Sequence, residues 1–184
     1  MCVPTEPCSP HCTIPTAGSS SSMCLRKWLT ALLITWTLPR TIMPEEPIDG
    51  AIERARTALS LGREIPGSAA HVARIDRPGT GYYLVRFGAE NATLAVAAVD
   101  AASGEVLSYA KLPGSGPHLA VTAEEATRRA GAKPIGTPHL VWRPCRASFS
   151  MLFPLWEIPT AMGSVYVDQQ RRLWTVLEPG GPGG

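Results

Sequence analysis

Apolar side chains recur with a helical period near the start of the well-patterned part of the chain. Four of them follow one another at spacings of four, three and four residues: Ile48, Ile52, Ala55 and Leu59. This spacing places them on one face of an α-helix, with Glu53, Arg54 and Arg56 elsewhere on its circumference. Gly62, just past the last apolar position, suits a left-handed C-cap. The pattern therefore predicts an amphipathic helix over residues 47–61.

Short runs of β-branched and aromatic residues follow, and each run is bounded by Gly, Asn, Asp or Ser. Such bounded runs are typical of strands. The segment from Asp100 to Gly104 reads D-A-A-S-G, which fits a type I turn followed by a left-handed Gly and predicts a tight hairpin. We expect four strands, at residues 71–76, 81–88, 92–100 and 105–112.

The same order of elements returns in the second half of the chain. Thr122-Ala-Glu-Glu125 is a capping box, which predicts a helix to about Ala130, and Gly131 ends it. Pro154 falls inside a strand-like run, and because Pro cannot donate to a sheet it indicates an edge position or a bulge. The four expected strands are residues 139–142, 150–158, 164–168 and 173–178.

Two pairs of residues share one spacing across the two halves. His71 and His139 are 68 residues apart, and so are Asp100 and Asp168. This common spacing favours a duplicated helix-plus-meander unit, over residues 43–116 and 117–179, although chance alignment of short strands is an alternative. Two such units need to share a core or one sheet. The expected fold is α+β, strand-rich, with antiparallel meanders.

Residues 1–42 differ in composition from the rest of the chain. Residues 1–22 hold a single charged residue, three Cys and a Ser run, which is typical of a disordered leader. Met23 opens a segment in which two basic residues precede an apolar run, as in a secretory signal, but no small-x-small cleavage site follows. A mis-called start, with translation beginning at Met43, is the third interpretation.

Localisation depends on which of these interpretations holds. A start at Met43 implies the cytoplasm, and a true signal at Met23 implies an extracytoplasmic protein. Membrane association follows only if residues 23–42 are a signal or an anchor. At the other end, residues 180–184 are expected to be a flexible Gly/Pro tail.

Composition narrows the class of protein. Of 184 residues, 45% are hydrophobic and 17% charged, the formal net charge is +2 and the mean hydropathy is +0.03. These values exclude a highly charged disordered chain and a polytopic membrane protein. The chain lacks a basic stripe, a P-loop and a dinucleotide-binding glycine motif, so we expect no nucleic-acid partner and no small-molecule cofactor.

Few residues suggest catalysis or metal binding. Cys145 is the only Cys after residue 24, and although Arg143 and Arg146 flank it, no nucleophile signature surrounds it. His71 and His139 occupy matching strand starts, but two imidazoles alone are too few for a metal site. We therefore expect no catalytic residue and no metal. A small enzyme using Cys145 is the less favoured alternative.

Two hairpin segments carry a family resemblance. Residues 99–106 read VDAASGEV and residues 165–174 read VYVDQQRRLW. Together with the preceding helices they resemble PepSY-like domains, in two degenerate tandem copies over residues 44–179. The second copy departs from the family pattern, with Arg171 and Arg172 where the turn Gly belongs. The resemblance implies a non-catalytic binding or regulatory module of bacterial origin, possible roles being peptide or protease binding in trans. A structural cell-envelope domain is the alternative.

Six of the twelve aromatic residues of the chain lie in the second unit: Trp142, Phe149, Phe153, Trp156, Tyr166 and Trp174. Filling a small core is the ordinary explanation, and an exposed patch for a protein or peptide partner is the other. If binding is the function, we expect it on the strand of Phe153, Trp156 and Glu157, with Pro154 marking an unpaired edge. The adjoining hairpin would add Tyr166 and Trp174 to the same surface.

Overall fold

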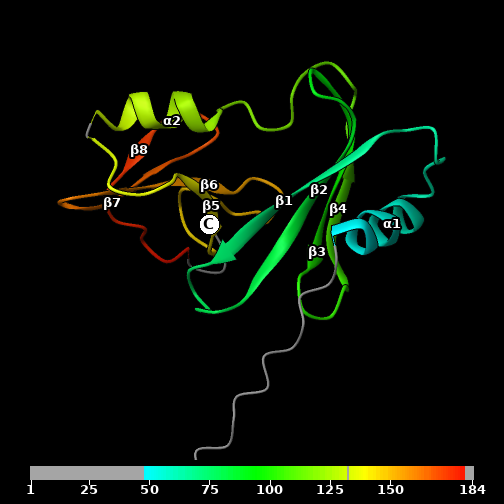
Figure 1. Ribbon diagram of the computed structural model, residues 1–184, viewed down its shortest axis with the longest axis horizontal. Coiled ribbons are helices and arrows are strands. Elements are labelled where there is room, and N and C mark those ends of the chain that lie inside the picture. Colours follow the sequence, from blue (N-terminus) through cyan, green and yellow to red (C-terminus); the bar gives the residue numbers. More distant parts are fainter. Residues whose placement is uncertain (1–47, 132, 181–184) are drawn as a thin grey trace, which may run out of the picture. The chain divides into compact units, whose positions relative to one another are not determined.

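Two helices and eight strands make up the part of the chain that the computed structural model describes, residues 48–131 and 133–180 (Figure 1). The protein is therefore a strand-rich α+β protein, as its sequence predicts. The predicted leader and signal-like segment lie outside the described residues, as do residues 181–184 of the predicted tail. The elements are α1 (Ile48–Leu59), β1 (Gly67–Arg74), β2 (Gly81–Ala89), β3 (Ala92–Asp100), β4 (Val106–Lys111), α2 (Ala123–Ala130), β5 (His139–Trp142), β6 (Leu155–Thr160), β7 (Gly163–Val167) and β8 (Leu173–Trp174).

All eight strands belong to one sheet, in the order β4-β3-β2-β1-β5-β6-β7-β8. Neighbouring strands are antiparallel except at the centre, where β1 and β5 are parallel and Val72 lies opposite Leu140. The two meanders therefore extend outward from this central pair. The register of β1 and β5 has the same 68-residue offset as the paired His and Asp residues of the sequence.

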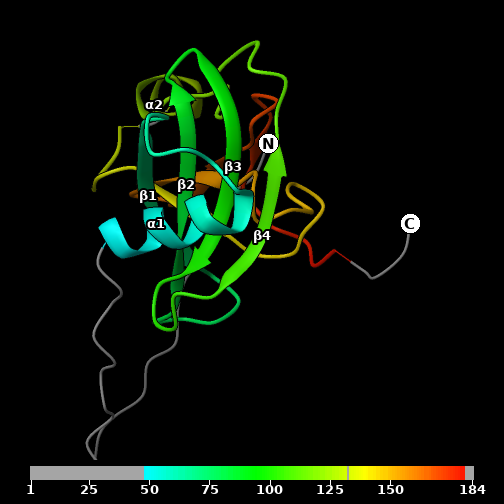
Figure 2. The same cartoon turned by 90° about the vertical axis from the view of Figure 1, so that its right-hand side faces the viewer.

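The two helices cover opposite faces of the sheet. Directly opposed residues share a face, whereas consecutive residues such as Tyr82 and Tyr83 point to opposite faces. Tyr83 packs in the cluster under α1, and Val167 packs in the cluster with Ala126 of α2. Figure 2 shows α1 lying across the strands of the first half. Tyr82 lies on the same face as Val167, because each residue in the following series lies opposite the next one on the neighbouring strand: Tyr82, Val72, Leu140, Trp156 and Val167. The face that α2 covers is therefore the face opposite α1.

Helix α1 buries Ala55 and Leu59 of the predicted apolar face together with the neighbouring Ala51, whereas Ile52 is partly buried and Ile48 is 50% exposed. The expected position of Arg56 on its polar side is wrong, because this side chain is 8% exposed. Its guanidinium donates to the carbonyls of Gly62 at 2.6 Å and Ile65 at 2.9 Å and lies over the ring of Phe87. Arg56 thus donates hydrogen bonds to carbonyl oxygens of the turn after the helix, while the aliphatic part of its side chain packs on the core.

Helix α2 begins and ends where the sequence predicts. The Thr122 hydroxyl accepts a hydrogen bond from the Glu125 amide at 3.2 Å, and Gly131 has the left-handed φ of 66°. The Glu125 carboxylate pairs with Arg129 in the next turn and with Arg171 at 2.8 Å. The second contact ties α2 to the turn between β7 and β8.

The aspartates that share the 68-residue spacing have equivalent places in the two halves, at the turn between the third and fourth strands. The Asp100 carboxylate accepts from the amides of Ala102 and Ser103, and the turn closes at Gly104 with φ 70°. The corresponding left-handed position after Asp168 is Arg171, with φ 68°. A left-handed side chain costs about 1 kcal/mol, so contacts elsewhere must hold this second turn in place.

Asp168 supplies those contacts. Its carboxylate is almost completely buried and accepts from the amides of Gln170 and Arg172, both at 2.9 Å. It also accepts from the Arg172 guanidinium at 2.7 Å and from the Trp174 indole at 3.0 Å. One carboxylate therefore fixes both the turn and the short strand β8.

Three expectations about strands in the second half need correction. The predicted strand at 150–158 begins only at Leu155, because the Ser148 hydroxyl donates to the carbonyls of Ser150 and Phe153 and turns the chain. Strand β6 lies between β5 and β7, so the unpaired edge inferred from Pro154 is wrong. The predicted strand at 173–178 is shortened to two residues because β7 pairs with Leu173 and Trp174 alone.

Removing the two turn carboxylates should affect stability unequally. We expect Asp168→Ala to lower the free energy of unfolding by about 2–4 kcal/mol, since it leaves several donors in a buried site without an acceptor. Asp100→Ala should cost about 1 kcal/mol, because water can reach the donors it leaves. Urea denaturation followed by circular dichroism measures both. Equal losses would contradict the role assigned to Asp168.

Candidate functional site

The five residues proposed from the sequence for binding occupy three separate places. Glu157, Tyr166 and Trp174 are successive cross-strand partners on β6, β7 and β8, so they share one face. Trp156 precedes Glu157 on the same strand and points to the other face. Phe153 lies in the loop before β6 and is 43% exposed. The structure therefore does not bring these five side chains together as one surface.

Glu157 is the centre of a polar group on the first of these faces. Its carboxylate accepts from the Ser164 hydroxyl and, at 3.5 Å, from the Tyr166 hydroxyl, and its other oxygen lies 3.4 Å from His139 Nε2. Burial, with the nearby charge of Glu157, raises the pKa of Tyr166. The register of β1 and β5 sets His71 beside His139 in the same row. These groups largely satisfy one another, which favours a structural role.

The two tryptophans of the proposed set also have internal partners. The Trp156 indole donates to the Val121 carbonyl at 2.8 Å, and its ring packs between two core clusters. The Trp174 indole donates to Asp168 and its ring lies under the guanidinium of Arg172. Both side chains hold the second half together, and neither is free to serve mainly as a contact for a partner.

Phe153 borders a surface cavity of about 380 Å³ at the end of the sheet where β6 begins. We call it the Phe149 cavity, after the ring that is 77% exposed at its rim. The guanidinium of Arg146 has no ion pair or hydrogen bond within residues 48–131 and 133–180. No carboxylate from this described part of the chain lines the cavity, whose walls are Arg146, Ala147, Ser148, Phe149, Ser150, Phe153, Gln169, Gln170 and Arg172.

A second cavity of about 220 Å³ lies on the other side of Phe153. Its walls are Thr93, Phe153 and the Pro/Gly-rich segment from Leu112 to His118. The ring of His118 packs against that of Phe153 at 4.9 Å between centroids. Phe153 is therefore a shared wall between two adjoining cavities, one apolar and one flanked by arginines.

His118 is buried at this shared wall and hydrogen-bonded to two other segments of the chain. Its Nε2–H donates to the Leu152 carbonyl at 2.5 Å, and its own amide donates to the Thr93 hydroxyl. Burial lowers the pKa of His118, and the nearby Arg86 charge lowers it further. The imidazole thus anchors the loop that carries Phe153.

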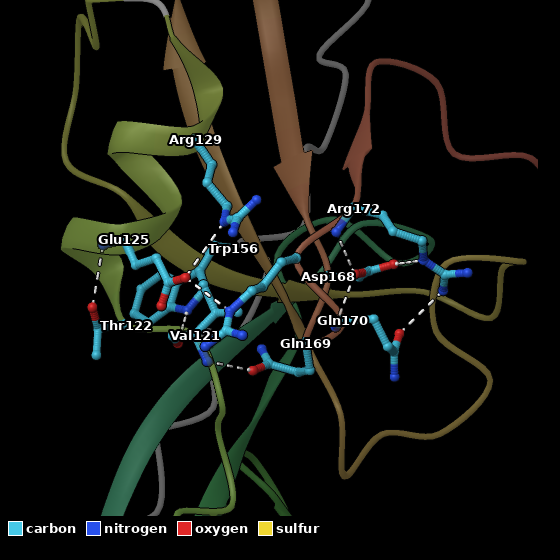
Figure 3. A network of polar contacts seen from close by, with 10 residues as sticks. Val121, Thr122, Glu125, Arg129, Trp156, Asp168, Gln169, Gln170 and Arg172 are labelled. Atoms are coloured by element: carbon cyan, nitrogen blue, oxygen red, sulfur yellow. Dashed lines mark hydrogen bonds and ion pairs between the residues drawn. The ribbon is translucent and has the colours of Figure 1, made fainter.

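A network of polar contacts fixes the wall of the Phe149 cavity that comes from the turn between β7 and β8 (Figure 3). The buried Gln169 amide donates to the Pro154 carbonyl at 2.9 Å and accepts from the Val121 amide at 3.2 Å. Asp168 holds one edge of Arg172, whose side chain stays 57% exposed. The turn is therefore rigidly placed, with a guanidinium that can still reach a ligand.

The remaining candidates from the sequence are Cys145 and a metal site. Cys145 is completely buried in an apolar cluster with Val141 and Leu155, which gives no support to a nucleophilic role. Within the described residues no group of three or more His, Cys, Asp or Glu side chains could hold a metal ion. In the same part of the chain no helix has the length and apolarity needed to cross a membrane.

Comparison with known proteins adds no relative. No protein-family model matches the chain, and neither the curated proteins nor the solved structures searched include a match.

Sequence reasoning missed Arg146 and Phe149, two exposed residues of the Phe149 cavity. Arg146 was considered only as a neighbour of Cys145, and Phe149 only as one of several aromatics. The sequence does contain a signal for an exposed loop here. Residues 146–150 read R-A-S-F-S, which places an arginine and a phenylalanine among small residues that are typical of a loop.

Lowering the pH should reduce the stability of the fold through protonation of His118. A lowered pKa means that the unfolded chain binds the proton more readily, so stability is complete above the ordinary His pKa and falls as the pH drops below about 6.5. We expect the free energy of unfolding to decrease between pH 7 and about pH 5, and His118→Gln to reduce that slope. Urea titrations across this range test it. An unchanged slope in the variant would contradict the assignment.

Proposed function

We propose that this protein is a non-catalytic binding module that takes an extended peptide segment carrying an apolar side chain beside an acidic group. The observation that carries the proposal is the pair of adjoining cavities that share Phe153 as a wall. One is flanked by Arg146 and Arg172 without a carboxylate from the described residues, and the other is lined by Leu112 and Pro/Gly backbone.

The chemistry of the walls favours an acidic ligand. Arg146 has a guanidinium with all its donors available, and Arg172 is held on one edge only. Hydrogen bonds between a guanidinium and a carboxylate are among the stronger ones in proteins, and charge complementarity selects against basic segments. The Gln170 side-chain nitrogen adds a neutral donor for a peptide backbone, because its side-chain oxygen accepts from Arg172 at 3.1 Å.

Two exposed rings supply the apolar part of the contact. Phe149 and Phe153 stand at the rim and at the shared wall, 77% and 43% exposed. Aromatic and arginine side chains are enriched among the residues that dominate binding energy at interfaces. Because Gln169 and His118 hold the loops in place, little ordering would be needed when a peptide binds.

We further propose that the two halves are degenerate PepSY-like units, which would give this binding a regulatory role toward a protease or other target. Support comes from the order of elements, a helix followed by four antiparallel strands in each half, and from the matching turns at Asp100 and Asp168. A purely structural domain of the cell envelope would lack the selective affinity proposed here.

A peptide selection on the full-length protein tests the proposal. Peptides from a random phage-displayed library should converge on sequences with acidic and apolar residues. With a fluorescein-labelled selected peptide, we expect Arg146→Glu and Phe149→Ser each to raise the dissociation constant about tenfold or more in anisotropy titrations. Each substitution is at an exposed position, so the fold should survive.

Matched variants on other surfaces serve as controls. Arg128→Glu on α2 makes the same charge change, and Met162→Ser on the hairpin between β6 and β7 removes another exposed apolar side chain. Both should bind as wild type does. A basic consensus, or equal affinity of wild type and Arg146→Glu, would refute the proposed site.

A further inference from the structure

A third cavity, of about 290 Å³, lies beside the hairpin that joins β2 and β3. We call it the Arg86 cavity. It shares no wall residue with the Phe149 cavity, and Thr93 is the one residue that also lines the adjoining apolar cavity. Its walls are Ser68, Arg86, Gly88, Ala89, Glu90 and Thr93.

Arg86 is an unpaired cation within this cavity. Its Nε is shielded from solvent and has no hydrogen-bond partner, and none of its nitrogens pairs with a carboxylate of the described residues. An arginine can hardly lose its proton, so the group stays charged. A shielded charged donor without an acceptor is costly, and in proteins such groups are usually paired or bound to a ligand.

Two hydroxyl groups add donors to the same wall. Thr93 Oγ1 accepts from the His118 amide at 3.2 Å, so its hydrogen must point elsewhere, and no acceptor for it occurs among the described residues. Ser68 lies directly opposite Arg86 on the neighbouring strand, which puts its side chain on the same face of the sheet. Its hydroxyl likewise has no acceptor in the part of the chain that the structure describes. Three donors thus line one cavity without an acceptor among residues 48–131 and 133–180.

We propose that the Arg86 cavity binds the carboxylate of a small organic acid. The planar fork of a guanidinium matches the two oxygens of a carboxylate, and the hydroxyls of Thr93 and Ser68 can donate to the same oxygens. The cavity is larger than a carboxylate alone needs, so the acid carries a short carbon chain that lies along Gly88 and Ala89. Glu90 at the same cavity repels a second negative charge and so selects a monocarboxylate.

Nuclear magnetic resonance of arginine side chains in the full-length protein provides the test. The Nε–H signal of Arg86 is identified by its loss in Arg86→Lys, and butyrate, succinate and inorganic phosphate are titrated at constant ionic strength. We expect butyrate to shift this signal in a saturable way. In Arg86→Lys, binding followed through the Thr93 and Gly88 backbone amides should be about tenfold weaker or more, because the fork is lost.

Two further variants keep the outcome decisive. Arg77→Lys, at an exposed arginine, should bind butyrate as wild type does, and Glu90→Gln should bring succinate up to the affinity of butyrate. Circular dichroism confirms that each variant is folded. The proposal is overturned if no acid shifts the Arg86 signal, if inorganic phosphate shifts it as butyrate does, or if Arg86→Lys binds butyrate as tightly as wild type.

Discussion

The parallel pairing of β1 with β5 is the contact on which the rest of the structure depends. It joins two antiparallel meanders through only three residue pairs, from Val72 with Leu140 to Arg74 with Trp142. Val72 and Leu140 belong to the core on one face of the sheet, and Ala73 and Val141 belong to the core on the other. Leu140, Val141 and Trp142 of β5 are buried, whereas in β1 Val72 is buried and Ala73 and Arg74 are partly buried, so the cores of the two faces meet at this pair.

This pairing also assembles the surfaces proposed for binding. The apolar cavity combines Leu112 and His118 from the chain after β4 with Phe153 from the loop before β6. These segments are neighbours because the chain returns from the outer strand β4, through α2, to the centre of the sheet. Gln169 then ties the last turn to both of them. A peptide site made of loops from both halves therefore exists only if the sheet is continuous.

Local pattern was sufficient to predict much of the fold. The strands at 92–100 and 139–142 match to the residue, and Thr122 and Gly131 mark the ends of α2, because turn residues and caps act over a few positions. The loop before β6 resembles a strand in sequence because Met151, Leu152 and Phe153 form a short apolar run, and only the Ser148 hydrogen bonds turn the chain there. The parallel register of β1 and β5 is a tertiary property that the 68-residue spacing merely suggests.

The binding residues were harder to predict for a related reason. A sequence shows that an arginine is present but not whether it has a partner, and the free guanidiniums of Arg86 and Arg146 follow from what the fold places around them. For the two tryptophans, the fold supplies internal partners that the sequence does not reveal. Trp156 and Trp174 looked suited to binding, yet the Val121 carbonyl and the Asp168 carboxylate take their indole donors.

Native-state hydrogen exchange tests most directly whether the two meanders form one cooperative sheet. Amides of β1 and β5 should exchange with the same free energy of opening as those of β2 and β3, close to that of global unfolding, because both cores meet at the central pair. Exchange of β5, β6 and β7 at a markedly lower free energy, while β1 to β3 stay protected, would contradict it. The second half would then open alone, and the sites shared between the halves would lose their structural basis.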